Sequence, residues 1–532
     1  MKKAARLVFI PFPGVSHLAS TLEFAKLLIN RDERIWITVL VIKLPNSQDD
    51  ATAGLERLEI INLPDCESHK PITDIVEQQK PHVKQVVSEL KLRSSGVPLA
   101  GFVVDMFCTT MIDVAKHFEL PSLVFFTSAL AFLALMLHLH SLREQGDTDF
   151  KTQDQILIPT FANPVPSTAL PSSVLNKDWD SFFVAFGRGL LKADAIVINS
   201  FQDLESHVLA NFNSKALSLS LSLPLPLPPI YPVGPILNSN NTTDSGIIFN
   251  WLDQQPPSSV VFLCFGSMGS FGEDQVREIA RALQNSAARF LWSLRKPPPK
   301  ASSFINPPTD YAPSDLLQLL PPHFFDRTAA FGMVIGWAPQ AQILAHPATG
   351  AFVSHCGWNS ILESIYFGVP IATWPLYAEQ QTNAFLLVRE LNLAVDIAMD
   401  YRVDFKARPN FLVSADKIEK GIRTLMNMDQ ETRRRLKEMS QKSRNTSLEG
   451  GSSYSYLGRL IDYIIDQRGL GLPPNLNQPP PPPYQEPPGP NAAQSPPITV
   501  AQSPNGGVFA SGDDMSMAIY GMAAALLLLL QF

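Results

Sequence analysis

Residues 355–360 form a polar turn, His-Cys-Gly-Trp-Asn-Ser, between an apolar run and an amphipathic stretch. A helix that begins at such a turn presents unpaired backbone N–H groups and the positive end of its dipole, and both suit a phosphate group. Gly357 lets the backbone approach a ligand closely, and the side chains of His355, Asn359 and Ser360 add donors. The turn therefore predicts a phosphate site.

The residues around this turn fit the remaining parts of a nucleotide ligand. Glu363 lies one turn further on the same face of the helix, where a carboxylate accepts hydrogen bonds from ribose hydroxyls. Trp337 offers a flat face to a base, and Gln340 offers an amide edge that matches uracil. Glu379 and Gln380 place acceptors beside donors, which suits sugar hydroxyls. Taken singly, the turn also fits an ordinary strand–helix junction, and Trp337 also fits a core.

Short apolar runs alternate with amphipathic stretches in both halves of the chain, which predicts parallel sheets covered by helices. Residues 214–235 interrupt this alternation with several prolines, which cannot donate to a strand ladder, so we interpret them as an interdomain linker. We predict an α/β fold of two doubly wound domains, 1–233 and 234–468, with ligands in the cleft between them. The predicted strands are 7–11, 36–42, 100–104, 122–126, 196–199, 260–265, 290–294, 333–335, 350–353 and 370–373, and the main predicted helices are 18–29, 109–118 and 273–286.

Composition excludes several classes of function. The chain has 532 residues, 45% of them hydrophobic, and a formal net charge of −7, which argues against nucleic acid as a partner. The four cysteines form no CxxC pair, so neither a zinc site nor a disulfide framework is indicated. Pro11 and Pro13 interrupt the first apolar run, which disfavours a secretory signal. A cytoplasmic protein fits these features best.

The end of the chain has a different composition. Residues 469–532 begin rich in proline, which predicts a disordered or polyproline II tail. The apolar stretch 519–532 is shorter than the about 20 residues of a spanning helix. It follows small polar residues in the order of a GPI-attachment signal, which requires entry into the endoplasmic reticulum. A weak membrane anchor and a mis-joined gene model both explain the tail, and we favour the second.

Residues 337–380 closely resemble the donor-binding signature box of plant secondary-product UDP-glycosyltransferases. The resemblance extends over 5–468, through FIPFPGVSHLAST, FVVDMF, YPVGPIL, WLDQQPPSSVVFLCFGSMGSF, RFLWSLR and GGSSYSYLGRLI. It is strongest to the branch that glycosylates flavonoids and other phenylpropanoids. It implies the GT-B architecture, two Rossmann-like domains facing a cleft, and a monomeric enzyme that moves a sugar from a UDP-sugar to a hydroxyl of a small lipophilic acceptor.

The resemblance also assigns roles. His17 corresponds to the catalytic base and Asp105 to the carboxylate that orients it, for an inverting displacement that needs no metal or other cofactor. UDP-glucose is the implied co-substrate, because Gln380 ends the box as in glucose-using relatives. The acceptor pocket would use Phe12, Phe107, Phe125, Phe126, Leu130 and 182–186, although such residues equally fit a core. The implied donor-binding set is Ser16, Ser267, Trp337, Ala338, Gln340, His355, Gly357, Trp358, Asn359, Ser360, Glu363, Glu379 and Gln380.

Two other functions compete with this one. A nicotinamide or flavin oxidoreductase needs GxGxxG after the first strand, where this chain has Pro-Gly-Val-Ser-His at 13–17. A catalytically inactive, sugar-nucleotide-binding relative that acts as an interaction protein would explain the tail. It would also explain the segment 45–55, which is shorter than in the family. The retained His17, Asp105, His355, Glu363 and Gln380 argue against it.

Overall fold

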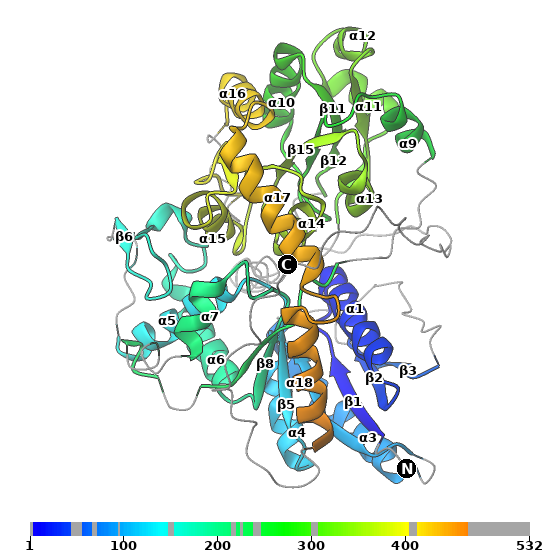
Figure 1. Ribbon diagram of the computed structural model, residues 1–532, viewed down its shortest axis with the longest axis vertical. Coiled ribbons are helices and arrows are strands. Elements are labelled where there is room, and N and C mark those ends of the chain that lie inside the picture. The colour runs from blue at the N-terminus through cyan, green and yellow to red at the C-terminus, as the bar shows by residue number, and fades with distance from the viewer. Residues whose placement is uncertain are drawn as a thin grey trace, which may run out of the picture.

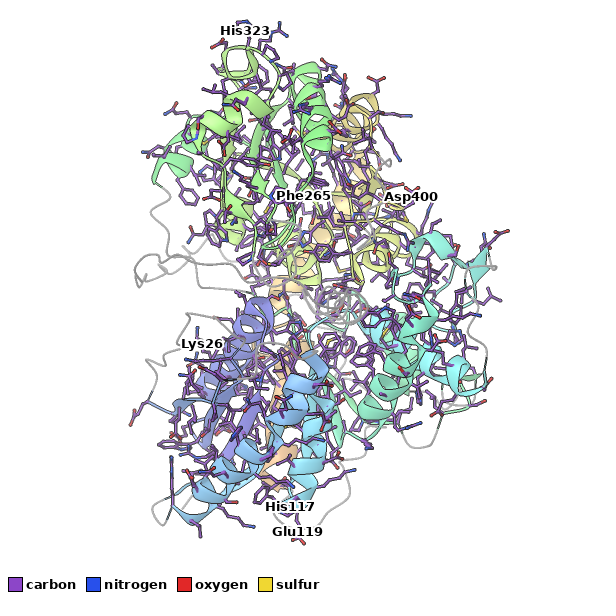
Figure 2. All side chains as sticks on the ribbon, turned by 180° about the vertical axis from the view of Figure 1, so that it is seen from behind. Lys26, His117, Glu119, Phe265, His323 and Asp400 are labelled. Atoms are coloured by element: carbon purple, nitrogen blue, oxygen red, sulfur yellow. The ribbon has the colours of Figure 1, made fainter. Side chains whose placement is uncertain are left out.

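Two lobes stacked along the long axis make up the computed structural model, each built around a parallel sheet (Figure 1). His323 of the second lobe and Glu119 of the first mark its far ends (Figure 2). The structure describes residues 4–43, 56–65, 72–93, 96–146, 150, 154–213, 217, 220–223, 227–237, 246–298, 307–403 and 412–466. The segment 45–55 and the tail 469–532 both lie wholly outside these residues.

The first sheet has the strand order β3-β2-β1-β4-β5-β8-β9, with parallel pairing throughout. The order reverses between β1 and β4, which is the switch point where open α/β sheets bind ligands. Its strands are β1 (Ala5–Ile10), β2 (Ile35–Val41), β3 (Leu58–Asn62), β4 (Leu99–Asp105), β5 (Ser122–Phe126), β8 (Ala195–Ile198) and β9 (Ile230–Pro232). Its helices are α1 (Val15–Arg31), α2 (Ile72–Gln78), α3 (Lys80–Leu92), α4 (Ile112–His117), α5 (Leu130–Glu144), α6 (Asp180–Leu191) and α7 (Ser206–Asn213).

The second sheet has the order β14-β11-β10-β15-β16-β17, again all parallel, with its switch point between β10 and β15. Its strands are β10 (Val260–Cys264), β11 (Arg289–Ser293), β14 (Gly332–Ile335), β15 (Thr349–Ser354), β16 (Ile371–Thr373) and β17 (Ala394–Asp396). Its helices are α9 (Gly246–Asp253), α10 (Glu273–Ser286), α11 (Pro313–Leu319), α12 (Phe324–Thr328), α13 (Gln340–Ala345), α14 (Trp358–Phe367), α15 (Gln380–Phe385), α16 (Ala415–Met426) and α17 (Gln430–Asn445).

The linker interpretation of 214–235 was wrong at its end. Ile230–Pro232 forms β9, the last strand of the first sheet, paired in parallel with β8. A proline is compatible with this position because an edge strand leaves one row of N–H groups unpaired.

The chain returns to the first lobe at its last described helix, α18 (Ser452–Asp466), which packs along the first sheet (Figure 1). The guanidinium of Arg31 stacks 3.6 Å from the ring centre of Tyr454, and the rings of Tyr231 and Tyr463 lie 6.4 Å apart. The predicted boundary at 233/234 stays a prediction, but residues 452–466 of the predicted second domain pack against the first sheet.

No helix among the described residues is long and apolar enough to span a membrane.

Candidate active site

The carboxyl ends of β1 and β4 bring His17 and Asp105 together. His17 lies in the first turn of α1, and Asp105 is the last residue of β4. Nδ1 of His17 lies 2.7 Å from Oδ2 of Asp105, and both side chains are fully buried. The other oxygen, Oδ1, accepts the backbone N–H of Phe107 at 2.9 Å. Both carboxylate oxygens are therefore occupied, so the carboxylate fixes the orientation of the imidazole ring.

Aromatic rings surround this pair. The ring centres of Phe12 and Phe107 lie 5.4 and 5.7 Å from that of His17. The ring centres of Phe107 and Phe186 lie 5.4 Å apart, and the ring of Phe182 stacks on that of Phe186. These members of the predicted acceptor pocket therefore lie around the imidazole.

The other predicted pocket residues belong to the core. Phe125 stacks on Phe24 at 4.7 Å, and Phe126 and Leu130 are buried in the same cluster. These three side chains are at most 2% exposed.

A cavity of about 160 Å³ lies at the switch point of the second sheet. Ser16 of the first lobe also lines it, so this cavity reaches the neighbour of His17. The structure brings together, around it, the predicted residues Ser16, Ser267, Trp337, Ala338, Gln340, His355, Gly357, Asn359, Ser360 and Glu363. A larger cavity of about 520 Å³, between α17 and the last turn of α14, contains none of them.

Two glycines leave the space that the ring of His355 occupies at this cavity. A Cβ at Gly266 or at Gly357 would lie 2.5 Å from Nε2 of His355, and Gly266 also has a φ of +79°. Burial lowers the pKa of His355 to about 4, so the ring is neutral at physiological pH. Its Nδ1 is buried without a hydrogen-bond partner among the described residues, which suits a group that binds a polar ligand.

Gln340 links two polar residues on α14. Its Nε2 donates to Oγ of Ser360 at 2.9 Å and to Oε2 of Glu363 at 2.8 Å. Burial raises the pKa of Glu363 to about 7. Trp337 is 43% exposed, which is unusual for so large a ring and leaves its face available for stacking.

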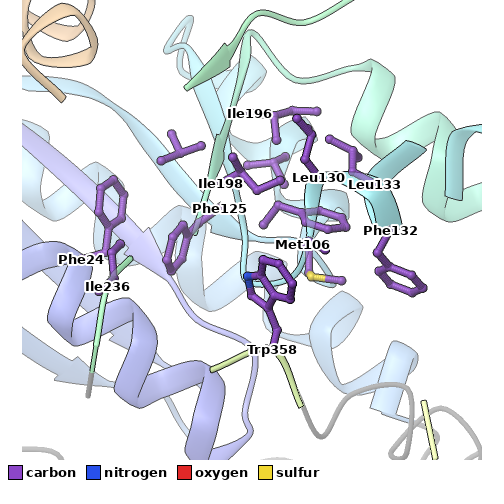
Figure 3. Packing of buried hydrophobic residues seen from close by; sticks show 14 of the residues in the cluster. Phe24, Met106, Phe125, Leu130, Phe132, Leu133, Ile196, Ile198, Ile236 and Trp358 are labelled. Carbon is purple, nitrogen blue, oxygen red and sulfur yellow. The ribbon is translucent and has the colours of Figure 1, made fainter. Parts of the chain in front are cut away.

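Trp358 does not line the cavity. Its side chain is buried in the cluster that includes Met106 and Phe125, and its indole N–H donates to the carbonyl oxygen of Asn199 at 2.6 Å (Figure 3). The side chain therefore connects the start of α14 to the first lobe.

Glu379 and Gln380 lie beyond the lining residues, both buried. Oε1 of Gln380 accepts the backbone N–H groups of Leu376 and Tyr377, which leaves its NH₂ as the donating end. Oε1 of Glu379 accepts from Asn383, whereas Oε2 is buried with no hydrogen-bond partner within the described part of the chain. An unsatisfied buried acceptor of this kind suits a ligand hydroxyl.

Sequence reasoning missed some lining residues. Cys264 and Ser293 are the last residues of β10 and β11, so the rule that ligands bind at the carboxyl ends of the strands could have identified them. The others had no local signal. The missed set is Cys264, Gly266, Ser293, Arg295, Ala341 and Tyr377.

Metal ligands do not gather in the described ranges: no three His, Cys, Asp or Glu side chains there are placed to hold an ion.

Comparisons with known proteins agree with this geometry. A family model described as "UDP-glucoronosyl and UDP-glucosyl transferase" matches residues 174–398. The chain is 48% identical to UDP-glucose flavonoid 3-O-glucosyltransferase 6 of Fragaria ananassa, over 87% of this chain and 99% of the relative. It is similar to a solved UGT transferase from Siraitia grosvenorii in complex with UDP, with 44% identity, a TM-score of 0.77 and coverage of 87% and 100%. Medicago truncatula UGT71G1, complexed with UDP-glucose, gives 39% identity, a TM-score of 0.75 and coverage of 87% and 99%.

Proposed function

This chain belongs to the UDP-glucoronosyl and UDP-glucosyl transferase family, and from that premise we propose that it transfers glucose from UDP-glucose to a hydroxyl of a small phenolic acceptor such as a flavonoid. The predicted family and the GT-B fold are both confirmed. The similarity to a flavonoid glucosyltransferase supports the acceptor class, and the similarity to a UDP-glucose complex supports the donor.

The observation that carries the proposal is the buried His17–Asp105 pair next to a residue of the donor cavity. The acceptor oxygen attacks the anomeric carbon of glucose, and the bond from that carbon to the diphosphate breaks. The acceptor's proton passes to Nε2 of His17, and Asp105 stabilises the imidazolium that forms. Attack opposite the leaving UDP inverts the α-linked donor to a β-glucoside.

The donor is held by the residues of the second switch point. Trp337 and Ala338 take the base, and Glu363 takes the ribose. Gln340 was predicted to match uracil, but its Nε2 donates to Ser360 and Glu363, so we place it with Glu363 at the ribose. The N-terminus of α14 takes the phosphates, because its N–H groups and dipole stabilise the negative charge that develops on UDP. The backbone at Gly357 and Trp358 approaches the phosphates closely. Glu379 and Gln380, beyond the lining residues, hold the glucose hydroxyls through Oε2 of Glu379 and the NH₂ group of Gln380. Polar contacts to the phosphates come from Ser16, Ser267, His355, Asn359 and Ser360.

The test is acceptor-dependent release of UDP by the full chain, with UDP-glucose and a panel of flavonols, phenolic acids and terpenoid alcohols. We expect release with at least one phenolic acceptor and a β-glucoside as product. Binding of UDP with no release across the panel would instead support the inactive, sugar-nucleotide-binding alternative.

Glu363 gives the proposed donor site a pH dependence. With a pKa of about 7, this carboxyl is mostly protonated near pH 6 and ionised near pH 8, and the ionised form accepts ribose hydroxyls better. The affinity for UDP-glucose should therefore rise over this range. His355, with its pKa lowered to about 4, and Cys264, with its pKa raised to about 11, both stay neutral there.

Glu363→Gln should weaken UDP-glucose binding about 10- to 100-fold near pH 8 and abolish the rise with pH. Calorimetric titration with UDP-glucose measures both effects, because its diphosphate does not titrate in this range. Parallel pH curves for the wild type and the variant would contradict the role of Glu363.

We also propose that the enzyme acts as a cytoplasmic monomer with the domain boundary at 233/234. Cys108, Cys264 and Cys356 are buried free thiols, which supports a reducing compartment.

A further inference from the structure

Arg295 lines the donor cavity, and the proposed function assigns no role to this cation. It follows β11 and begins a short antiparallel ribbon, β12 (Arg295–Lys296) with β13 (Thr309–Asp310). The ribbon lies outside the regular strand–helix alternation, so sequence periodicity gave no reason to place it at the site.

The ribbon fixes the guanidinium on two of its three nitrogens. Nε lies 3.0 Å from Oδ1 of Asp310 and also donates to the carbonyl oxygen of Thr309, and Nη2 donates to the carbonyl oxygen of Pro308. Nη1 has no hydrogen-bond partner among the described residues. The side chain is 12% exposed, so an ordered cation keeps one donor group available at the cavity.

The anchored pair lies against the segment that carries Trp337. The carboxyl of Asp310 packs on Gly336, where a Cβ would lie 2.2 Å from Asp310 Cγ. Oγ of Ser293 donates to the carbonyl oxygen of the same Gly336 at 2.7 Å. The ribbon that holds Arg295 therefore packs on the residue before Trp337, and both Arg295 and Trp337 line the cavity.

We propose that Arg295 recognises the base of the donor, with its Nη1–H donating to a carbonyl oxygen of uracil. The inference rests on the proposed function and adds a residue that selects the nucleotide. Uracil carries two carbonyl acceptors and adenine carries none, so this contact favours uridine nucleotides. A fixed guanidinium suits the task because little conformational freedom is lost on binding.

Calorimetric titration of UDP and ADP against the wild type, Arg295→Met and Arg289→Met tests this role. We expect Arg295→Met to weaken UDP binding about 10- to 100-fold and to leave ADP binding unchanged, so that the UDP-to-ADP preference falls by that factor. Arg289→Met is the matched control, because Arg289 is exposed at the opposite end of β11. It should bind both nucleotides like the wild type.

Equal losses for UDP and ADP would overturn the proposal, because they would indicate a general charge effect on the diphosphate or a structural defect. Unchanged UDP binding would overturn it as well. Should Arg295→Met not fold, Asp310→Asn provides the test, since it keeps the guanidinium and removes its anchor. A wild-type UDP-to-ADP preference in that variant would contradict the proposal. A wild type that binds no UDP would refute the proposed function itself.

Discussion

We expect His17→Ala to lower kcat by about 10²- to 10⁴-fold and to leave the affinity for UDP near the wild-type value. The loss follows from removing the group that takes the acceptor's proton, because a neutral phenol or alcohol is a poor nucleophile. UDP binding is spared because Ser16, and not His17, lines the donor cavity. Acceptor-dependent UDP release measures kcat, and calorimetric titration measures UDP affinity.

His207→Ala is the matched control for this prediction, since His207 is an exposed histidine of α7. It should keep wild-type turnover. Two results would count against the base assignment: near-normal turnover in His17→Ala, or a loss of UDP binding as large as the loss of turnover. The second result would mean that the buried ring mainly supports the packing of Phe12 and Phe107.

Most strands of the two sheets could be predicted from the sequence, because a buried strand shows itself in the residue types of its own short segment. Buried parallel strands are apolar throughout, so the predicted strand 122–126 agrees with β5, and 260–265 with β10 to within one residue. Strands β3 and β17 were missed, because each is only partly buried and carries polar residues.

The distribution of side chains between cavity and core was harder to predict, because it depends on contacts far apart in sequence. Trp358 and Asn359 are neighbours in sequence. The indole N–H of Trp358 donates to Asn199 inside the core, whereas Asn359 lines the cavity and donates from its Nδ2 to Oγ of Ser20 in the first lobe. The same limit applies to Arg295, whose position depends on pairing with Asp310. A motif therefore identifies the segment that binds, and the packing of the two lobes decides which side chains reach the ligand.

Asp105→Asn should be nearly as damaging as His17→Ala, with a loss in kcat of about 10²- to 10⁴-fold, although it changes only one atom of a buried side chain. In the wild type both carboxylate oxygens accept, one from the N–H of Phe107 and the other from Nδ1 of His17. Asparagine offers one oxygen and one NH₂ group. The measurement is again acceptor-dependent UDP release, with calorimetric titration of UDP to show that the donor site is intact.

The direction of the effect follows from the two ways in which the amide can lie. An NH₂ group beside the N–H of Phe107 would oppose two donors where no water compensates, so the oxygen should stay there and the NH₂ should face His17. Nδ1 must then accept, which puts the imidazole proton on Nε2, the atom that has to take the acceptor's proton. Asp105→Ala leaves the tautomer free, so its turnover should be at least that of Asp105→Asn. Higher turnover in the asparagine variant would show that Asp105 acts through packing and not by setting the tautomer of His17.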